Sequence, residues 1–388
     1  MTGPRATGKT TSAERHSETV VRLDRAAEAV AFEADPDAAL RAQREPVLLD
    51  EWQAVPSVLG AVKRAVDADP SPGRFLLTGS VRGDIEAETW PGTGRLVRLR
   101  MYGLGERELA ARISGPTFLE KLRAGNLDAF TLPSDPPDLR GYVELALRGG
   151  YPDAALRLSG DAREAWLGGY LEQLLTRDAE GIAGHRDPLR LRRYFEAIAL
   201  STAGQPEHKT LYDAAQINRK TAIAYDTLLT NLFVLELVPA WASNRLTRLI
   251  KAPKRYLVDP ALAGAALGLD ATVVLRDGDL LGRLIDSFTV AQIRPELELT
   301  SHPPRLYHVR DKEGRHEIDL IAEIAAGDIL AIEIKATAAP TRQDARHLDW
   351  LRDELGDRFV TGAVLHTGPG LLRLAERILA IPICALWG

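Results

Sequence analysis

The sequence predicts an α/β fold divided among several domains, and three observations support that prediction. A glycine-rich loop with a lysine opens the chain at residues 3–10, and short apolar runs ending in polar residues follow at 46–51 and 74–80. A second group of strand-like runs, carrying acids and a lysine, lies at 306–335. With 388 residues, of which 45% are hydrophobic and 27% charged, the chain is long enough for two or three domains, and wholesale disorder is excluded.

Composition also excludes several classes of protein. The single cysteine, Cys384, rules out a disulfide framework and any zinc site built from cysteines. There is no apolar run long enough to cross a membrane and no signal-peptide pattern at the start, so we expect a cytoplasmic protein without a membrane partner. The formal net charge of −5 means that any contact with nucleic acid needs a local basic patch.

The glycine-rich loop is a full match to the pattern G-x-x-x-x-G-K-[ST]. Its backbone N–H groups can surround phosphate oxygens, Lys9 can reach the β- and γ-phosphates, and the hydroxyl of Thr10 can bind Mg²⁺. We therefore expect a nucleotide site. Its predicted cofactor-binding residues are Gly3, Arg5, Ala6, Thr7, Gly8, Lys9, Thr10 and Thr11, with Ser80 added from a later strand.

The next two apolar runs predict buried parallel strands, and the polar residues at their C-terminal ends are candidates for nucleotide binding and hydrolysis. The run at 46–51 ends in Asp50, expected to hold Mg²⁺, and Glu51, expected to polarise the attacking water. The run at 74–80 ends in hydroxyl residues that could sense the γ-phosphate.

These segments, together with Gly94-Arg95 and the run 104–106 ending in Glu, resemble the AAA-type ATPases of bacteria and archaea. The resemblance implies a P-loop NTPase sheet with Walker A, Walker B and sensor 1 elements, and ATP and Mg²⁺ as cofactors. For Arg95 two roles stay open: an arginine finger acting in trans within a homo-oligomer, or a surface ion pair. Only two residues precede Gly3, whereas a P-loop follows a buried strand, so we expect a sheet truncated at its first strand.

The middle of the chain is predicted to be helical and then to form a winged helix. Residues 113–188 suggest a helical lid on the ATPase, interrupted by a turn at 149–152. In 189–260 a helix is followed by a helix-turn-helix pattern and two strand-like runs that could form the wing.

This stretch contains eleven Lys and Arg against six Asp and Glu, opposite in sign to the whole chain. Such a cluster is sufficient for phosphate contacts with DNA, and it is also compatible with a winged helix that binds a protein partner. The predicted nucleic-acid contacts are Arg219, Lys220, Arg245, Arg248, Lys251 and Lys254.

The C-terminal strands carry Asp319, and then Glu333 and Lys335 on one strand face. Two carboxylates that bind Mg²⁺ beside a lysine that orients a water suit metal-assisted phosphodiester hydrolysis. The pattern resembles the PD-(D/E)xK restriction-endonuclease-like superfamily, with Asp286 or, more weakly, Glu296 as a further acid. The alternative is a solvated Glu–Lys pair on a nuclease-like fold that does not cleave.

We thus expect an AAA-type ATPase domain (1–112), a helical lid (113–188), a winged helix (189–260) and a nuclease-like domain (261–388). This order resembles a widespread bacterial family of ATPases. The resemblance implies that nucleotide state controls engagement of nucleic acid. A scaffolding ATPase for a protein partner, with an inactive nuclease-like fold, and a pseudo-ATPase are the alternatives.

Overall fold

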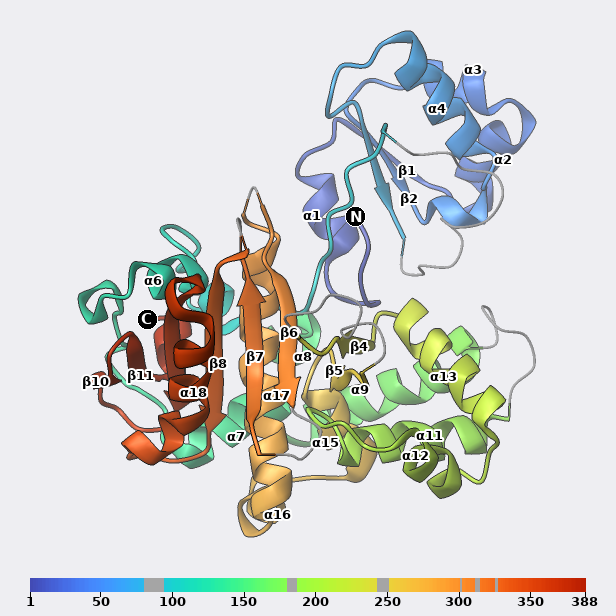
Figure 1. Ribbon diagram of the computed structural model, residues 1–388. Helices are drawn as coiled ribbons and strands as arrows, with labels where there is room; N and C mark the ends of the chain where they lie inside the picture. The colour runs from blue at the N-terminus through green and yellow to red at the C-terminus, as the bar shows by residue number, and fades with distance from the viewer. Residues whose placement is uncertain (80–93, 180–186, 243–250, 301, 311–314, 325–326) are drawn as a thin grey trace.

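The computed structural model describes residues 1–79, 94–179, 187–242, 251–300, 302–310, 315–324 and 327–388. The N-terminal domain contains a parallel sheet in the order β1-β2-β3 and stands apart from the rest of the molecule (Figure 1). Its strands are β1 (Thr19–Arg22), β2 (Val47–Asp50) and β3 (Phe75–Thr78). Its helices are α1 (Lys9–Glu14), α2 (Ala26–Ala34), α3 (Pro36–Arg41), the 3-10 turn η1 (Trp52–Ala54) and α4 (Val58–Ala68).

The parallel strands predicted at 46–51 and 74–80 are confirmed, and their register positions the site. Every residue of β2 is buried, as expected for a central strand with an uninterrupted apolar run. Asp50 ends that strand and pairs in register with Thr78 of β3. The two polar residues therefore meet at the C-terminal edge of the sheet, where α/β proteins place their ligands.

The glycine-rich loop enters the sheet beside β3. The backbone of Thr2 bridges in parallel fashion to Gly79 on one side and to Arg100 on the other. The N–H of Thr2 donates to the carbonyl of Leu99 at 2.9 Å, and the N–H of Met101 donates to the carbonyl of Thr2 at 2.8 Å. Thr2, directly before the loop, is thus joined by backbone contacts to Gly79 after β3 and to the segment at 99–101.

The middle of the chain forms a helical unit that ends in an antiparallel strand pair, β4 with β5. Its apolar core joins side chains of the first helices, such as Leu171, to Phe195 and Leu228 further along the chain. The helices and strands predicted within 189–260 are confirmed. The elements of the middle unit are α8 (Pro152–Leu156), α9 (Gly160–Gln173), the π-helical turn η4 (Leu174–Asp178), α11 (Pro188–Leu200), α12 (His208–Ala214), α13 (Arg219–Asn231), β4 (Leu235–Val238), β5 (Lys254–Leu257) and α15 (Ala261–Leu267). Of these, α11, α12, α13, β4 and β5 correspond to the predicted helices and strands.

The C-terminal part is a six-stranded mixed sheet in the order β10-β11-β9-β8-β7-β6, covered by helices. The antiparallel neighbours β6, β7 and β8 confirm the predicted meander, and β8 pairs in parallel with β9. The strands are β6 (Arg305–Arg310), β7 (Glu317–Glu323), β8 (Ile329–Lys335), β9 (Phe359–His366), β10 (Leu372–Ala375) and β11 (Ile378–Pro382). The helical elements are α16 (Ala271–Arg276), α17 (Gly278–Leu297), α18 (Arg346–Leu355) and the 3-10 turns η6 (Arg342–Ala345), η7 (Gly356–Arg358) and η8 (Ile383–Leu386).

The segment 113–188 differs from the predicted lid. Its first helices pack against the C-terminal sheet, because Phe118, Leu122 and Tyr142 share one apolar core with Leu320 and Ile332. Its later helices belong to the core of the middle unit. The helices up to Arg148 therefore do not form the predicted lid on the ATPase, whereas Tyr170 and Asp178 in the later part of the segment do contact the glycine-rich loop. The elements of 101–150 are α5 (Glu106–Leu109), α6 (Phe118–Ala124), η3 (Leu127–Ala129) and α7 (Leu139–Arg148).

Within the described residues, no helix is both long enough and apolar enough to cross a membrane.

Candidate functional site

The glycine-rich loop has the backbone that phosphate binding requires. Ala6 and Gly8 adopt positive φ angles of 59° and 85°, and alternating handedness of this kind makes successive N–H groups converge. Gly3 allows close approach to the neighbouring chain, since a Cβ there would lie 2.2 Å from the carbonyl oxygen of Met101. The hydroxyl of Thr7 donates to the carbonyl of Pro4 at 2.9 Å and closes the loop.

Lys9 is buried inside this loop. Its ammonium Nζ donates to the carbonyl oxygens of Gly3 at 3.1 Å and Pro4 at 2.6 Å. Burial lowers the pKa of Lys9 to about 8, and nearby Glu51 opposes that shift. The two hydrogen bonds described for this buried ammonium go to neutral carbonyl oxygens, so a negatively charged ligand would stabilise its charge further. The loop therefore fits the phosphates of a nucleotide.

Asp50 is the centre of the predicted magnesium site. The hydroxyl of Thr10 donates to Oδ1 of Asp50 at 2.8 Å, and the hydroxyl of Thr78 donates to the same oxygen. A carboxylate and a hydroxyl side by side are the oxygen ligands that hold Mg²⁺ in P-loop proteins. The residues present therefore fit a magnesium ion next to the phosphates.

Thr78 is a site residue that our residue-by-residue prediction missed. The sequence identified the polar end of β3 but indicated Ser80, which lies outside the described residues, as the nucleotide-binding residue there. Thr78 is 1% exposed and takes its position from the register of β2 with β3. The sequence did not distinguish the two hydroxyls, because the alignment of Thr78 with Asp50 depends on the register of the two strands.

The remaining predicted residues of this site are placed as follows. Glu51 directly follows β2 with a positive φ of 50°, and its carboxylate accepts a hydrogen bond from Gln53. Thr11 lies exposed on α1. Arg95 forms an ion pair with Asp67 of α4, which is the surface alternative of its two predicted roles.

The glycine-rich loop also contacts the middle unit, through residues of the segment that the sequence predicted as a lid on the ATPase. The guanidinium Nη1 of Arg5 lies 3.2 Å from Oδ1 of Asp178, a residue of the π-helical turn η4. The hydroxyl of Tyr170 on α9 donates to the carbonyl of Arg5 at 3.3 Å. Burial raises the pKa of the Asp178 carboxyl, and Arg5 opposes that shift.

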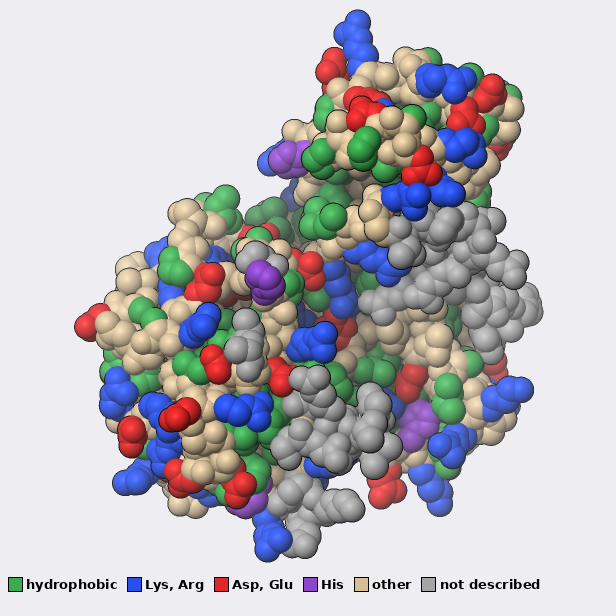
Figure 2. All heavy atoms as spheres, turned by 45° about the horizontal axis from the view of Figure 1, so that its top comes forward, with side chains coloured by type: hydrophobic (Ala, Val, Ile, Leu, Met, Phe, Trp, Pro, Cys, Tyr) green, Lys and Arg blue, Asp and Glu red, His purple; other side chains and the backbone are tan. Residues whose placement is uncertain are grey.

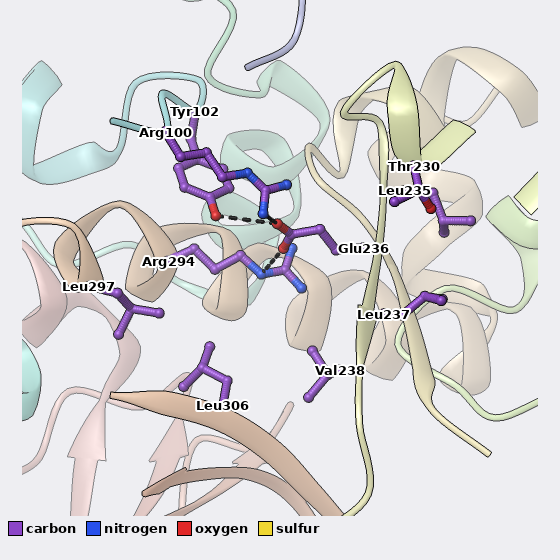
Figure 3. A pocket seen from close by; sticks show the side chains of 10 residues that line it. All are labelled: Arg100, Tyr102, Thr230, Leu235, Glu236, Leu237, Val238, Arg294, Leu297 and Leu306. Atoms are coloured by element: carbon purple, nitrogen blue, oxygen red, sulfur yellow. Dashed lines mark hydrogen bonds and ion pairs between the residues drawn. The ribbon is translucent and has the colours of Figure 1, made fainter. Parts of the chain in front are cut away.

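A cavity of about 340 Å³ lies where the N-terminal domain, the middle unit and the C-terminal part meet (Figure 3). Glu236 of β4 is at its centre and binds three partners. Its Oε1 accepts from Arg100 and from the hydroxyl of Tyr102, the latter at 3.2 Å, and its Oε2 lies 2.6 Å from Nε of Arg294 on α17. One buried carboxylate therefore ties together three parts of the chain.

The C-terminal residues Asp319, Glu333 and Lys335 are close together, on β7 and β8. Nζ of Lys335 lies 3.0 Å from Oε2 of Glu333, and Oδ2 of Asp319 accepts from the N–H of Ile334 at 2.9 Å. Burial and the adjacent Asp319 raise the pKa of Glu333 well above its usual range. Burial and Asp319 thus disfavour the charged form of Glu333, and the ammonium of Lys335 opposes that effect.

Two predictions about this region are corrected by the structure. Lys254 is 2% exposed, and its ammonium pairs with Asp286 and Asp319, so it cannot contact DNA as predicted. Glu296 lies outside the acid cluster because Arg107 and the N–H of Phe118 bind its carboxylate. Within the described residues, no group of three or more His, Cys, Asp or Glu is arranged to hold a metal ion.

The other predicted nucleic-acid contacts are scattered. Arg219 and Lys220 are exposed at the start of α13, whereas Lys251 is half-buried and donates to the carbonyl of Arg310 at 3.2 Å. Arg245 and Arg248 lie outside the described residues. On the face shown in Figure 2, Lys and Arg side chains are interspersed with Asp and Glu over the described part of the surface.

Comparison with known families finds an AAA-type domain in the N-terminal part of the chain, where the glycine-rich loop and Asp50 lie. Residues 1–110 match the family model of an AAA domain. Residues 139–273 and 281–386 match two domains of unknown function, DUF8612 and DUF4143.

The similar proteins carry no functional name. Uncharacterized proteins of Mycobacterium tuberculosis and Mycobacterium bovis are each 26% identical to this chain over 393 aligned residues, covering 98% of it and 79% of their own length. No solved structure matches the chain. The AAA match supports nucleotide binding by an ATPase-type domain, and the similar proteins leave the process it serves open.

Proposed function

We propose that the N-terminal domain binds Mg²⁺–ATP and hydrolyses it, and that the nucleotide state is transmitted to the middle and C-terminal parts. The observation that supports this most strongly is the convergence of Lys9, Thr10 and Asp50 at one end of the parallel sheet. When bound, Mg²⁺–ATP supplies the phosphoryl group to be transferred and the metal that neutralises its charge.

The residues of the chain have separate parts in this reaction. Lys9 leaves its two carbonyl partners and pairs with phosphate oxygens, while Thr10 and Asp50 hold the magnesium ion. Glu51 accepts a proton from the attacking water, and Thr78 keeps Asp50 oriented through its hydrogen bond. Positive φ at Glu51, in a residue other than glycine, holds its carboxylate just beyond the strand end.

Coupling to the rest of the chain rests on two contacts of the nucleotide loop. Arg5 pairs with Asp178 of the middle unit, and Thr2 shares backbone hydrogen bonds with the segment that contains Arg100. Arg100 in turn binds Glu236 of β4. Closure of the loop around phosphates therefore acts directly on side chains that hold the other parts in place.

Thermal unfolding and phosphate release, measured together, test the ATPase proposal. Mg²⁺–ATP should raise the melting temperature of the wild type, because a ligand that binds only the folded state stabilises it, and Lys9→Ala should remove that rise. Glu51→Gln should retain the rise but release phosphate roughly 100-fold more slowly, since the water loses its base. Lys63→Ala on α4 is the matched control and should behave as wild type. An unchanged rise in Lys9→Ala would place the nucleotide elsewhere.

A second candidate function is contact with duplex DNA through α13. It is favoured by the exposure of Arg219 and Lys220 at the start of that helix, which follows α12 in helix-turn-helix order and precedes the β4–β5 pair. Binding of labelled duplex DNA at several salt concentrations tests it. Absence of binding at low salt would favour a protein partner for the same surface.

A further inference from the structure

The acid cluster of the C-terminal part contains a cation that comes from another part of the chain. Asp286 on α17 and Asp319 on β7 face each other across the ammonium of Lys254, which is the first residue of β5. Nζ of Lys254 lies 2.6 Å from Oδ2 of Asp286 and 2.9 Å from Oδ1 of Asp319. The lysine side chain is 3% exposed, so the pairing takes place away from solvent.

Donors of the chain itself occupy all four carboxylate oxygens of the two aspartates. Lys254 binds one oxygen of each. The hydroxyl of Tyr256, also on β5, donates to Oδ1 of Asp286 at 3.0 Å, and the N–H of Ile334 donates to Oδ2 of Asp319 at 2.9 Å. A magnesium ion needs such oxygens at about 2.0–2.1 Å and therefore cannot enter while Lys254 remains between them.

Packing holds the lysine in this position. Burying a lone ammonium is costly, and two carboxylates at hydrogen-bond distance offset that cost, whereas removal of either partner leaves an uncompensated charge. β5 is buried at all four residues and pairs with β4, so Lys254 is fixed by a strand and not by a mobile loop. His308 lies on the adjoining strand β6 with Nε2 donating to the carbonyl of Ala252 at 3.2 Å, and it fixes the chain just before Lys254.

We propose that Lys254 is the resident cation of this cluster, occupying the place of a divalent metal and joining the middle unit to the C-terminal sheet. The nuclease-like arrangement of acids is then a structural junction between two parts of the chain. This inference stands independently of the ATPase proposal, because it involves none of the nucleotide-site residues.

Manganese binding without nucleotide, followed by electron paramagnetic resonance, tests the proposal on the full chain. In the wild type we expect the number of bound Mn²⁺ ions to be the same as in Asp319→Asn. Lys254→Met should gain about one Mn²⁺ per chain, because two carboxylates lose their cation, and adding Asp319→Asn should abolish the gain. Lys251→Met, three residues away, is the control and should gain none. Mn²⁺ bound by the wild type and lost in Asp319→Asn would overturn the proposal, as would a folded Lys254→Met that gains no Mn²⁺.

A second measurement applies if Lys254→Met does not fold. The proposal requires the charges of Lys254 and Asp286 to compensate each other. Lys254→Gln combined with Asp286→Asn should therefore melt at a higher temperature than Lys254→Gln alone. Additive losses in the double variant would show that the lysine is not the partner of the acids, and the proposal would fail.

Discussion

Raising the pH above neutrality should weaken nucleotide binding through the titration of a single side chain, Lys9. In the free protein burial lowers the pKa of Lys9 to about 8, while a lysine paired with phosphates titrates at a much higher pH. The charged fraction of Lys9 in the free protein then falls from about three-quarters at pH 7.5 to about one-tenth at pH 9. Because only the ammonium binds phosphate well, the affinity should fall about eightfold over this interval.

Calorimetric titration with the magnesium complex of a non-hydrolysable ATP analogue measures this change. Binding at about pH 8.5 should also take up about three-quarters of a proton per chain, detected as heat that varies with the ionisation enthalpy of the buffer. Arg5 and the carboxylates of Asp50 and Glu51 are the charged groups that stand around Lys9.

Lys9→Arg is the matched control, because a guanidinium keeps its charge throughout the range and its affinity should be flat with pH. An affinity that is constant from pH 7.5 to pH 9 in the wild type would refute the reasoning. It would mean either that Lys9 does not face the phosphates or that its ammonium is not destabilised by burial.

The sign of the same linkage predicts how the free protein responds to pH. A lysine with a lowered pKa binds its proton less tightly when folded than when unfolded. The free protein should therefore gain stability from this group as pH rises through about 8 toward the ordinary lysine value, and lose nucleotide affinity over the same range.

The nucleotide site was accessible from sequence because its parts are local. The loop motif fixes Lys9 and Thr10 within ten residues, and the acid of the next strand follows from the rule that parallel strands end at one edge. The same rule would have selected Thr78 over Ser80 had the register of β2 with β3 been known. Register depends on packing across the sheet, which the local pattern does not encode.

The role of Lys254 could not be predicted from the local sequence. In sequence it belongs to a basic run, and the charge count therefore indicated a basic patch able to contact DNA phosphates. Its partners are 32 and 65 residues away along the chain, on elements of another part of the fold. A charge count describes neighbours in sequence, whereas burial and pairing depend on neighbours in space.

The prediction of a lid over residues 113–188 was inaccurate for a related reason. Helical periodicity identified the apolar faces of the segment 113–188 correctly, but periodicity does not say which surface those faces cover. Phe118 and Tyr142 pack on the C-terminal sheet, while the helices beyond Tyr151 join the middle core. A segment that contributes to two cores joins them.

The β4–β5 pair connects two ion clusters of the described residues, one around Glu236 and one around Lys254. Glu236 on β4 is in register with Tyr256 on β5, and Lys254 lies two residues before that tyrosine. The guanidinium of Arg294 lies over the Tyr256 ring at 4.9 Å, and the tyrosine hydroxyl binds Asp286. The cluster that reaches the nucleotide domain through Arg100 is thus in contact with the cluster that contains Lys254.

Two further predictions concern the middle unit. Reversing charge at Arg219 and Lys220 together should weaken binding of all duplex DNA sequences alike and flatten its salt dependence, since phosphate contacts carry no sequence information; an unchanged salt slope in fluorescence anisotropy would contradict this. The other concerns Glu236, which is 13% exposed and binds Arg100 and Arg294. Glu236→Gln removes the only negative charge of that group and leaves two guanidinium groups facing each other in a confined space. It should lower the free energy of unfolding by about 3 kcal/mol, as expected for a buried ion pair that loses one partner. Urea unfolding measures the loss, and Asp153→Asn, which breaks the exposed pair with Arg157, is the control expected to change nothing measurable. If Glu236→Gln unfolds like the wild type, Glu236 does not hold the three parts together, and nucleotide-dependent coupling has to run through Arg5 and Asp178 instead.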